Sequence, residues 1–62
     1  MEDWRGVLIG RMHNYKVTQI DLANKLGLRR DYVSSVLNGK RNPPGAEERY
    51  NKAFVEILNE RM

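Results

Sequence analysis

The sequence contains no cysteine and only one histidine, His13. Without cysteine, neither a disulfide nor a thiolate metal site can stabilise the fold, and nothing points to an oxidising compartment. A zinc site is not expected around a lone histidine. We therefore predict a domain that folds without metal, disulfide or cofactor.

Long hydrophobic runs are also missing from the chain. No apolar stretch approaches the roughly 18 residues that a membrane-spanning helix needs. The first residues, MEDWRG, are acidic, whereas a signal peptide begins with a basic region. These absences predict a soluble protein of the cytoplasm with no membrane segment.

Catalytic patterns are scarce as well. His13 has no nucleophile pattern near it, and the acidic residues fall on predicted helix surfaces instead of forming a convergent pair. The sequence has no glycine-rich nucleotide loop. We therefore expect no enzymatic activity.

The charges that are present are unevenly distributed. The 62 residues predict one small domain, 1–62, whose net charge is +3 and whose pI is about 9.6. Cations gather in the middle third and carboxylates in the last third: Lys25, Arg29, Arg30, Lys40 and Arg41 against Glu47, Glu48, Glu56 and Glu60. The two parts are therefore expected to face different surroundings.

The first predicted helix covers about residues 2–13, with Asp3 as a candidate N-cap. Trp4, Leu8 and Met12 recur at helical spacing on one face. Gly6 and Gly10 fit a helix interior poorly, since glycine costs about 1 kcal/mol relative to alanine there. Their spacing indicates a bare surface or tight packing within the monomer, or else a self-association face.

The centre of the chain, QIDLANKLGLRRDYVSSV from Gln19 to Val36, has the apolar spacing of two short amphipathic helices. Thr18 is predicted to cap the first of them, and Gly27 to end it with a positive φ. The second helix is expected over about 30–38. This spacing alone predicts two helices packed at an angle and says nothing about DNA.

The segment TQIDLANKLGLRRDYVSSVLNGKRNP resembles the helix-turn-helix of the lambda-repressor-like, Cro/CI-type (XRE) DNA-binding domains. The family pattern is TQ-x-x-LA-x-x-LG, a second helix, then NGKR-x-P. The matching positions are Thr18, Gln19, Leu22, Ala23, Leu26, Gly27, Val33, Val36, Asn38, Gly39, Lys40, Arg41 and Pro43. The resemblance implies a compact all-α fold of four helices, or five as in most relatives, with the helix-turn-helix at about 18–38.

The resemblance also implies a DNA-binding surface, with the second helix of the pair in the major groove. Three residues of that helix correspond to family positions that face base edges: Arg30, Asp31 and Ser35. Positions near the phosphate backbone are held by Gln19, Arg29, Tyr32, Asn38, Lys40 and Arg41. The loop NGKRN is expected to add exposed backbone N–H groups to its two cations.

Several of these residues have simpler explanations. Gln19 could be an ordinary solvated side chain, and Asp31 could serve only as negative charge at a helix N-terminus. Asn38 and Gly39 are also typical of a helix C-cap, with Gly39 in the left-handed conformation. Tyr32 is either a contact to phosphate or thymine methyl, or an exposed ring.

The chain departs from the family pattern in three ways. Lys16 replaces the usual glycine after the first helix, so we expect that turn to be built through Asn14. Met12 and Leu37 stand where many relatives have an arginine and a glutamate, and we predict that the two apolar side chains pack together. The chain is also too short for five helices of ordinary length.

The last part of the chain predicts one long helix over about 46–60. The run Pro43-Pro44-Gly45 stops any preceding helix. An apolar stripe follows and is expected to close the core: Tyr50, Ala53, Phe54, Ile57 and Leu58. Val55, Met62 and Trp4 are candidates for a modest dimer seam, although scattered exposed apolar residues are also common.

Two functions follow from these patterns. The first is sequence-specific binding to double-stranded DNA by a small transcriptional repressor or regulator of phage or mobile-element type, as a weak homodimer or a dimer formed on DNA. The second is an antitoxin-like or co-regulator module that keeps the fold and acts through a protein partner. A cationic loop beside the helix pair favours the first, since a pure interaction module has no need of one.

Overall fold

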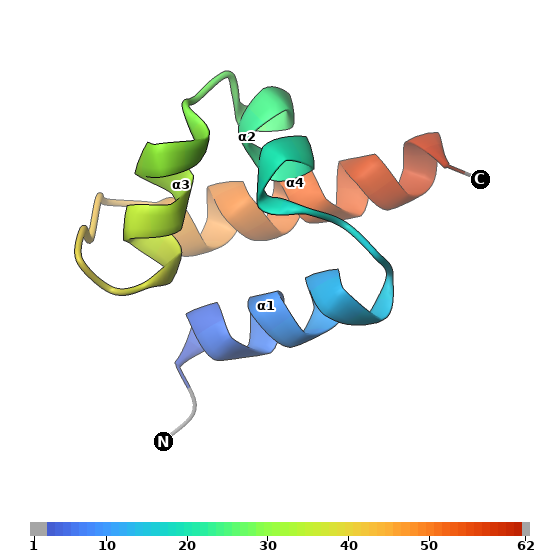
Figure 1. Ribbon diagram of the computed structural model, residues 1–62. Helices are drawn as coiled ribbons and strands as arrows, with labels where there is room; N and C mark the ends of the chain where they lie inside the picture. Colours follow the sequence, from blue (N-terminus) through green and yellow to red (C-terminus); the bar gives the residue numbers. More distant parts are fainter. Residues whose placement is uncertain (1–2, 62) are drawn as a thin grey trace.

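The computed structural model describes residues 3–61 and consists there of four helices (Figure 1). Their bounds are α1 Trp4–Asn14, α2 Gln19–Leu26, α3 Arg30–Leu37 and α4 Ala46–Glu60. The predicted all-α fold is confirmed, with four helices in the described part and α4 as the long last one. Asp3 is the N-cap of α1, as predicted, and Glu2 lies outside the described residues.

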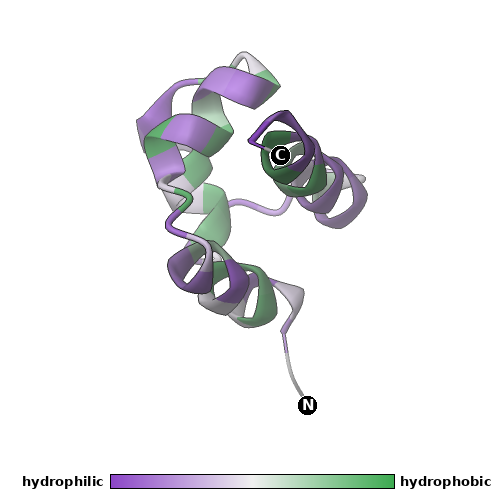
Figure 2. Ribbon diagram, turned by 90° about the vertical axis from the view of Figure 1, so that its right-hand side faces the viewer, coloured by the Kyte–Doolittle hydropathy of each residue, from purple (hydrophilic) through white to green (hydrophobic). Residues whose placement is uncertain are grey.

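The core is formed where all four helices meet. α2 packs mainly on α4 and α3, and α1 lies across α4 and α3. Along each helix, hydrophobic residues alternate with hydrophilic ones, as the colours of Figure 2 show. The buried apolar residues are Leu8, Met12, Val17, Leu22, Ala23, Val33, Val36, Leu37, Ala46, Tyr50, Ala53, Phe54 and Ile57.

Met12 and Leu37, the two apolar replacements, are both members of this core. Their exposed fractions are 4% and 3%. Apolar side chains suit such positions because a buried charge without its partner is strongly destabilising. The direct contact between the two side chains stays a prediction.

The turn between α1 and α2 is built differently from our expectation. Asn14 is the last residue of α1, and Lys16 itself has the left-handed backbone, with φ 57°. Two hydrogen bonds hold Lys16 there: its N–H donates to the His13 carbonyl at 3.2 Å, and the next N–H, of Val17, donates to the Met12 carbonyl at 2.8 Å. The prediction that Asn14 would build the turn was therefore wrong.

The same hydrogen-bond arrangement closes α2. Gly27 has φ 72°, as predicted, and its N–H donates to the Asn24 carbonyl, while the N–H of Leu28 donates to the Ala23 carbonyl at 2.9 Å. In both turns an apolar residue then enters the core and the next helix begins two residues later. α2 is thus framed by two turns of one geometry.

Gly6 and Gly10 lie on α1 with open space around them. A Cβ atom built on either glycine would meet nothing within 4 Å. Tight packing within the monomer, one of the explanations offered by their spacing, is therefore excluded. The remaining explanations are a bare surface and a self-association face.

Ile20 and Trp4 differ in how far they join the core, and Trp4 packs against it as its spacing with Leu8 and Met12 predicts. Ile20, an apolar residue of the segment Gln19 to Val36, is 53% exposed and so does not join the core. Trp4 is half-buried against the core, where its ring meets Tyr50 edge to face at 6.0 Å. Of the proposed dimer seam, Val55 is exposed, Trp4 is largely engaged within the monomer, and Met62 lies outside the described residues.

Candidate nucleic-acid interface

The outward face of α3 carries the residues expected to read bases. Arg30 and Asp31 begin the helix with side chains that are 62% and 93% exposed. The nearest guanidinium nitrogen and carboxylate oxygen are 3.9 Å apart, which brings the two side chains together as a loose ion pair. Asp31 also lies in the first turn of α3, where negative charge is favourable, so the structure is compatible with both explanations of this residue.

Ser35 lies one turn further along α3 and is half-buried. Its hydroxyl donates to the carbonyl of Asp31 at 3.0 Å. Since a hydroxyl has one hydrogen and two lone pairs, Ser35 held in this way can accept a hydrogen bond but not donate one. Its chemistry then suits the amino groups of cytosine or adenine.

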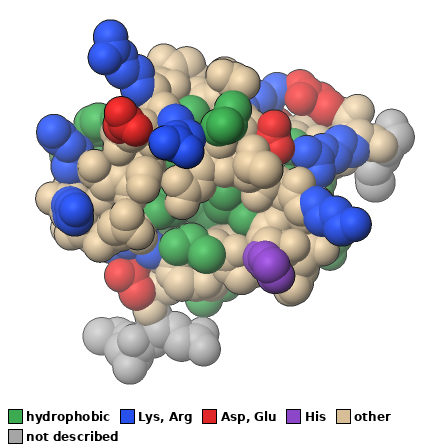
Figure 3. Space-filling model, viewed as in Figure 1, with side chains coloured by type: hydrophobic (Ala, Val, Ile, Leu, Met, Phe, Trp, Pro, Cys, Tyr) green, Lys and Arg blue, Asp and Glu red, His purple; other side chains and the backbone are tan. Residues whose placement is uncertain are grey.

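Arg29 is the N-cap of α3 and makes no side-chain cap hydrogen bond, as its chemistry predicts. Its side chain is exposed next to the start of the helix. No carboxylate of residues 3–61 pairs with Arg29, Lys40 or Arg41. In Figure 3 blue side chains lie over α3 and its neighbouring loops, and a second group lies on the opposite side of the same view.

The loop after α3 has fewer available donors than expected. The N–H groups of residues 38–41 all donate to carbonyls of α3, those of Lys40 and Arg41 to the Ser35 carbonyl at 2.9 and 3.3 Å. Asn38 is the C-cap and Gly39 has φ 81°, which confirms their predicted capping role. The prediction of exposed backbone N–H groups in this loop was wrong for 38–41, because closing the helix uses them.

Tyr32 connects this loop with the core. Its ring is half-buried against the core cluster, so it is not simply an exposed ring. The guanidinium carbon of Arg41 lies 5.3 Å from the centre of the ring, within the range of a cation–π contact. Tyr32 thus supports one of the two loop cations.

The N-terminus of α2 is closed by a reciprocal capping box. The Thr18 hydroxyl accepts from the N–H of Asp21 at 3.1 Å, and the Asp21 carboxylate accepts from the N–H of Thr18 at 3.0 Å. This backbone hydrogen bond lowers the pKa of Asp21, and the nearby Arg61 guanidinium lowers it further against a partial desolvation. Gln19, the first residue of α2, is half-buried beside this box.

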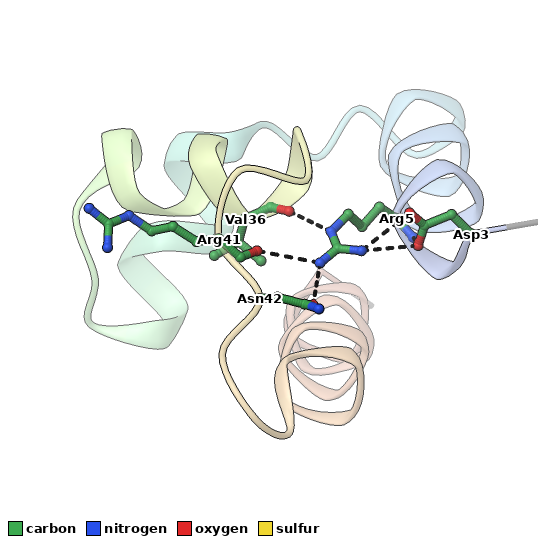
Figure 4. Close-up of polar contacts among 5 residues, drawn as sticks. All are labelled: Asp3, Arg5, Val36, Arg41 and Asn42. Carbon is green, nitrogen blue, oxygen red and sulfur yellow. Dashed lines mark hydrogen bonds and ion pairs between the residues drawn. The ribbon is translucent and has the colours of Figure 1, made fainter.

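Arg5 is a residue of this region that the sequence did not reveal. From α1 it reaches the last turn of α3 and the following loop (Figure 4). Its Nε donates to the Val36 carbonyl at 2.6 Å, and its Nη2 donates to the Asn42 side-chain oxygen at 2.6 Å and to the Arg41 carbonyl at 3.4 Å. Helical periodicity places Arg5 beside the core stripe, but no pattern in the sequence indicates acceptors 31 to 37 residues away.

The arrangement therefore has two helices joined at a tight turn, an exposed arginine at the start of the second, and a cationic loop at its end. Residues 11–47, more than half of the chain, match the family model described as helix-turn-helix. The chain belongs to the Cro/CI-type (XRE) helix-turn-helix family. Searches of curated proteins and of solved structures gave no match.

Membership of this helix-turn-helix family makes the chain a DNA-binding regulator in general terms, and the family is typically non-enzymatic. Within residues 3–61, no helix is both long and apolar enough to cross a membrane. The matched segment begins in α1 and ends just inside α4, so it contains the whole helix pair and its flanking turns.

Proposed function

We propose that this protein binds double-stranded DNA in a sequence-specific manner, as a small transcriptional repressor or regulator of phage or mobile-element type. The observation that carries the proposal is the exposed Arg30 guanidinium at the start of α3, flanked by the cations Arg29, Lys40 and Arg41. An arginine in this position can donate two hydrogen bonds to guanine O6 and N7 in the major groove. The neighbouring cations supply the attraction to phosphates that precedes base reading.

The proposed division of labour follows from the chemistry of each side chain. Arg30 reads a guanine, Ser35 accepts from a base amino group, and Asp31 either accepts from cytosine or orients Arg30. The remaining residues of the surface contact the phosphate backbone: Gln19, Arg29, Tyr32, Asn38, Lys40 and Arg41. Backbone contacts set the register of α3, and base contacts set its sequence preference.

The proposal is tested by selecting sequences from a random duplex pool and measuring the enriched duplex at several salt concentrations. Contact with several phosphates gives a linear fall of log K with log salt, of slope about −0.9 per phosphate. An enriched motif shows base reading. If no duplex is enriched or bound even at low salt, the protein does not bind DNA in this way.

Arg30 and Lys40 separate the two kinds of contact. Arg30→Ala is expected to relax the preference at one base pair, by roughly 1–3 kcal/mol of discrimination, while Lys40→Ala weakens binding to all duplexes alike. Binding constants for the selected duplex and for single-base variants give both quantities. Arg49→Ala and Lys52→Ala are matched controls, because both residues are exposed on α4 outside the proposed surface. Equal losses on every sequence from Arg30→Ala and Lys40→Ala would remove the base-reading role of Arg30.

A second candidate function is an interaction module that acts through a protein partner, including a second copy of the chain. The open face of α1 around Gly6 and Gly10 and the 43% exposed Val55 favour it. Sedimentation of the free protein and of its complex with the selected duplex distinguishes a monomer, a dimer in solution and a dimer formed on DNA. Two copies on a palindrome, each bound more tightly than a single copy on a duplex with one half-site, support dimerisation on DNA.

A further inference from the structure

We infer that Arg5 is a positioning residue of the DNA interface: it holds the loop of residues 40–42 against the end of α3, so that the loop cations are in place before DNA arrives. This inference rests on the proposed function. Arg5 lies on α1, outside the helix pair, and is not one of the residues proposed to contact DNA. Its effect on binding would therefore be transmitted through the loop.

The first support is the number and placement of the contacts that Arg5 makes. Its guanidinium binds three acceptors in two segments: the Val36 carbonyl in the last turn of α3, and Arg41 and Asn42 in the loop (Figure 4). The planar fork of arginine can serve such acceptors at once, and no other side chain has this geometry. Only 12% of the Arg5 side chain is exposed, so it is engaged by the protein and not by solvent.

Arg5 is itself held in a fixed position. Its Nη1 pairs with the carboxylate of Asp3 at 3.2 Å, and its guanidinium carbon lies 5.0 Å from the centre of the Trp4 ring. Asp3 is at the same time the N-cap of α1, accepting from the N–H of Arg5 at 3.2 Å. The Arg5 side chain is thus held at the start of α1 on one side and bound to α3 and its loop on the other.

The second support is electrostatic. α3 has no basic residue in its own last turn, although cations are favourable at a helix C-terminus. The Val36 carbonyl lies at that terminus and accepts from both the Gly39 N–H at 3.1 Å and Arg5 Nε at 2.6 Å. Arg5 supplies from α1 the charge that α3 lacks, and hydrogen bonds with one ionised partner are stronger than neutral ones.

The consequence for DNA concerns the two loop cations. The N–H groups of Lys40 and Arg41 are tied to the Ser35 carbonyl, and Arg5 fixes the chain immediately beyond, at Arg41 and Asn42. The loop is therefore fastened on both sides of its cations. A loop that is already ordered in the free protein loses less conformational entropy on binding, and this preorganisation increases affinity.

Arg5→Lys tests the inference because it keeps the charge and removes the fork. If the loop loosens, affinity for the selected duplex falls because the loop must then be ordered on binding. If one phosphate contact is lost as well, the slope of log K against log salt becomes shallower by about 0.9. Loss of that contact makes the deficit in affinity of Arg5→Lys about eight-fold larger at 0.1 M salt than at 1 M, since ten raised to 0.9 is about eight. Arg11→Lys is the matched control: Arg11 is on the same helix, but its guanidinium lies 4.8 Å from the Phe54 ring, away from the loop.

A second measurement follows the loop in the free protein. Amide hydrogen exchange at Lys40 and Arg41 should be faster in Arg5→Lys than in the wild type, while exchange at Leu22, whose N–H donates to the Thr18 carbonyl, should be unchanged. Asn42→Ala removes one loop partner at the surface and keeps Arg5 on Val36. It is expected to act in the same direction, more weakly, and it replaces Arg5→Lys if that variant does not fold.

The outcomes separate the inference from the proposed function. If the wild type binds no duplex, the proposed function fails, and with it the role of Arg5 in DNA binding, whatever the exchange rates. If the wild type binds, faster loop exchange with an unchanged affinity for the selected duplex makes Arg5 a purely structural residue and overturns the inference. A shallower slope with unchanged exchange overturns it too, because the effect then does not pass through the loop.

Discussion

The two turns that flank α2 share one backbone geometry and differ in the residues that build it. Each has a left-handed residue, then an apolar residue that enters the core, then an N-cap: Lys16-Val17-Thr18 in the first turn and Gly27-Leu28-Arg29 in the second. The first turn has a favourable N-cap but an unfavourable left-handed residue. The second has the glycine that this backbone prefers but no side-chain cap.

Each turn contains one residue that is unfavourable for its position, and other interactions offset its cost. A lysine at φ 57° is stabilised by the hydrogen bonds around it, including those of the Arg61 Nη1 to the Tyr15 and Lys16 carbonyls at 3.1 and 3.4 Å. An uncapped α3 is stabilised by burial of Val33, Val36 and Leu37. In both turns the residue at the poor position is an exposed cation.

Thr18→Ala is expected to change the free energy of unfolding most. It removes the side-chain cap of the first turn, so that neither turn has one. Loss of the hydroxyl leaves the Asp21 N–H without its acceptor and should lower the free energy of unfolding by about 1–2 kcal/mol. Urea unfolding followed by circular dichroism measures the change. Ser34→Ala is a control on α3 that removes a hydroxyl from outside any N-cap. A loss under 0.3 kcal/mol would mean that the capping box contributes little.

Lys16→Gly gives the first turn the residue that the second already has. Glycine relieves a left-handed cost of about 1–2 kcal/mol, partly offset by its greater freedom in the unfolded chain, for a net stabilisation of about 0.5–1 kcal/mol. Thermal and urea unfolding both report it. Lys16→Ala controls for the side chain, since alanine keeps the backbone penalty. Equal stabilities of the two variants would show that the turn does not strain residue 16.

Arg29→Thr gives the second turn the cap that the first has, and its expected effect is the smallest. A hydroxyl at this N-cap should stabilise the fold by about 0.5 kcal/mol, which in a domain of this size raises Tm by roughly 2–4 °C. The same change removes a cation from the proposed phosphate contacts, so DNA affinity should fall while stability rises. Arg29→Ala removes the same cation without adding a cap hydroxyl and serves as the control. A stabilised variant with unchanged affinity would remove Arg29 from the proposed surface.

Much of this fold could be predicted because the deciding information is local. The caps at Asp3 and Thr18, the left-handed Gly27 and the apolar stripe of α4 each follow from residues within a few positions of one another. The helix pair also follows a family pattern, which identified α3 as its second helix.

What could not be predicted depends on distant or backbone partners. Propensity assigns a left-handed residue to Asn14 before Lys16, and only the closing hydrogen bonds to His13 and Met12 reverse that order. The sequence did not indicate that the loop N–H groups are hydrogen-bonded. Their acceptors are backbone carbonyls, which every residue has, so no residue type marks them. Arg5 is hidden for the same reason, since two of its acceptors are the carbonyls of Val36 and Arg41.

The use of carbonyls by Arg5 also bears on how this surface can change during evolution. Because the guanidinium binds the backbone at positions 36 and 41, replacing the Arg41 side chain leaves that acceptor in place. The chemistry displayed by the loop can then vary while its path is retained. Asn42 is the exception, since its contact is made through the side chain. New binding preferences can therefore arise at position 41 at less structural risk than at position 42.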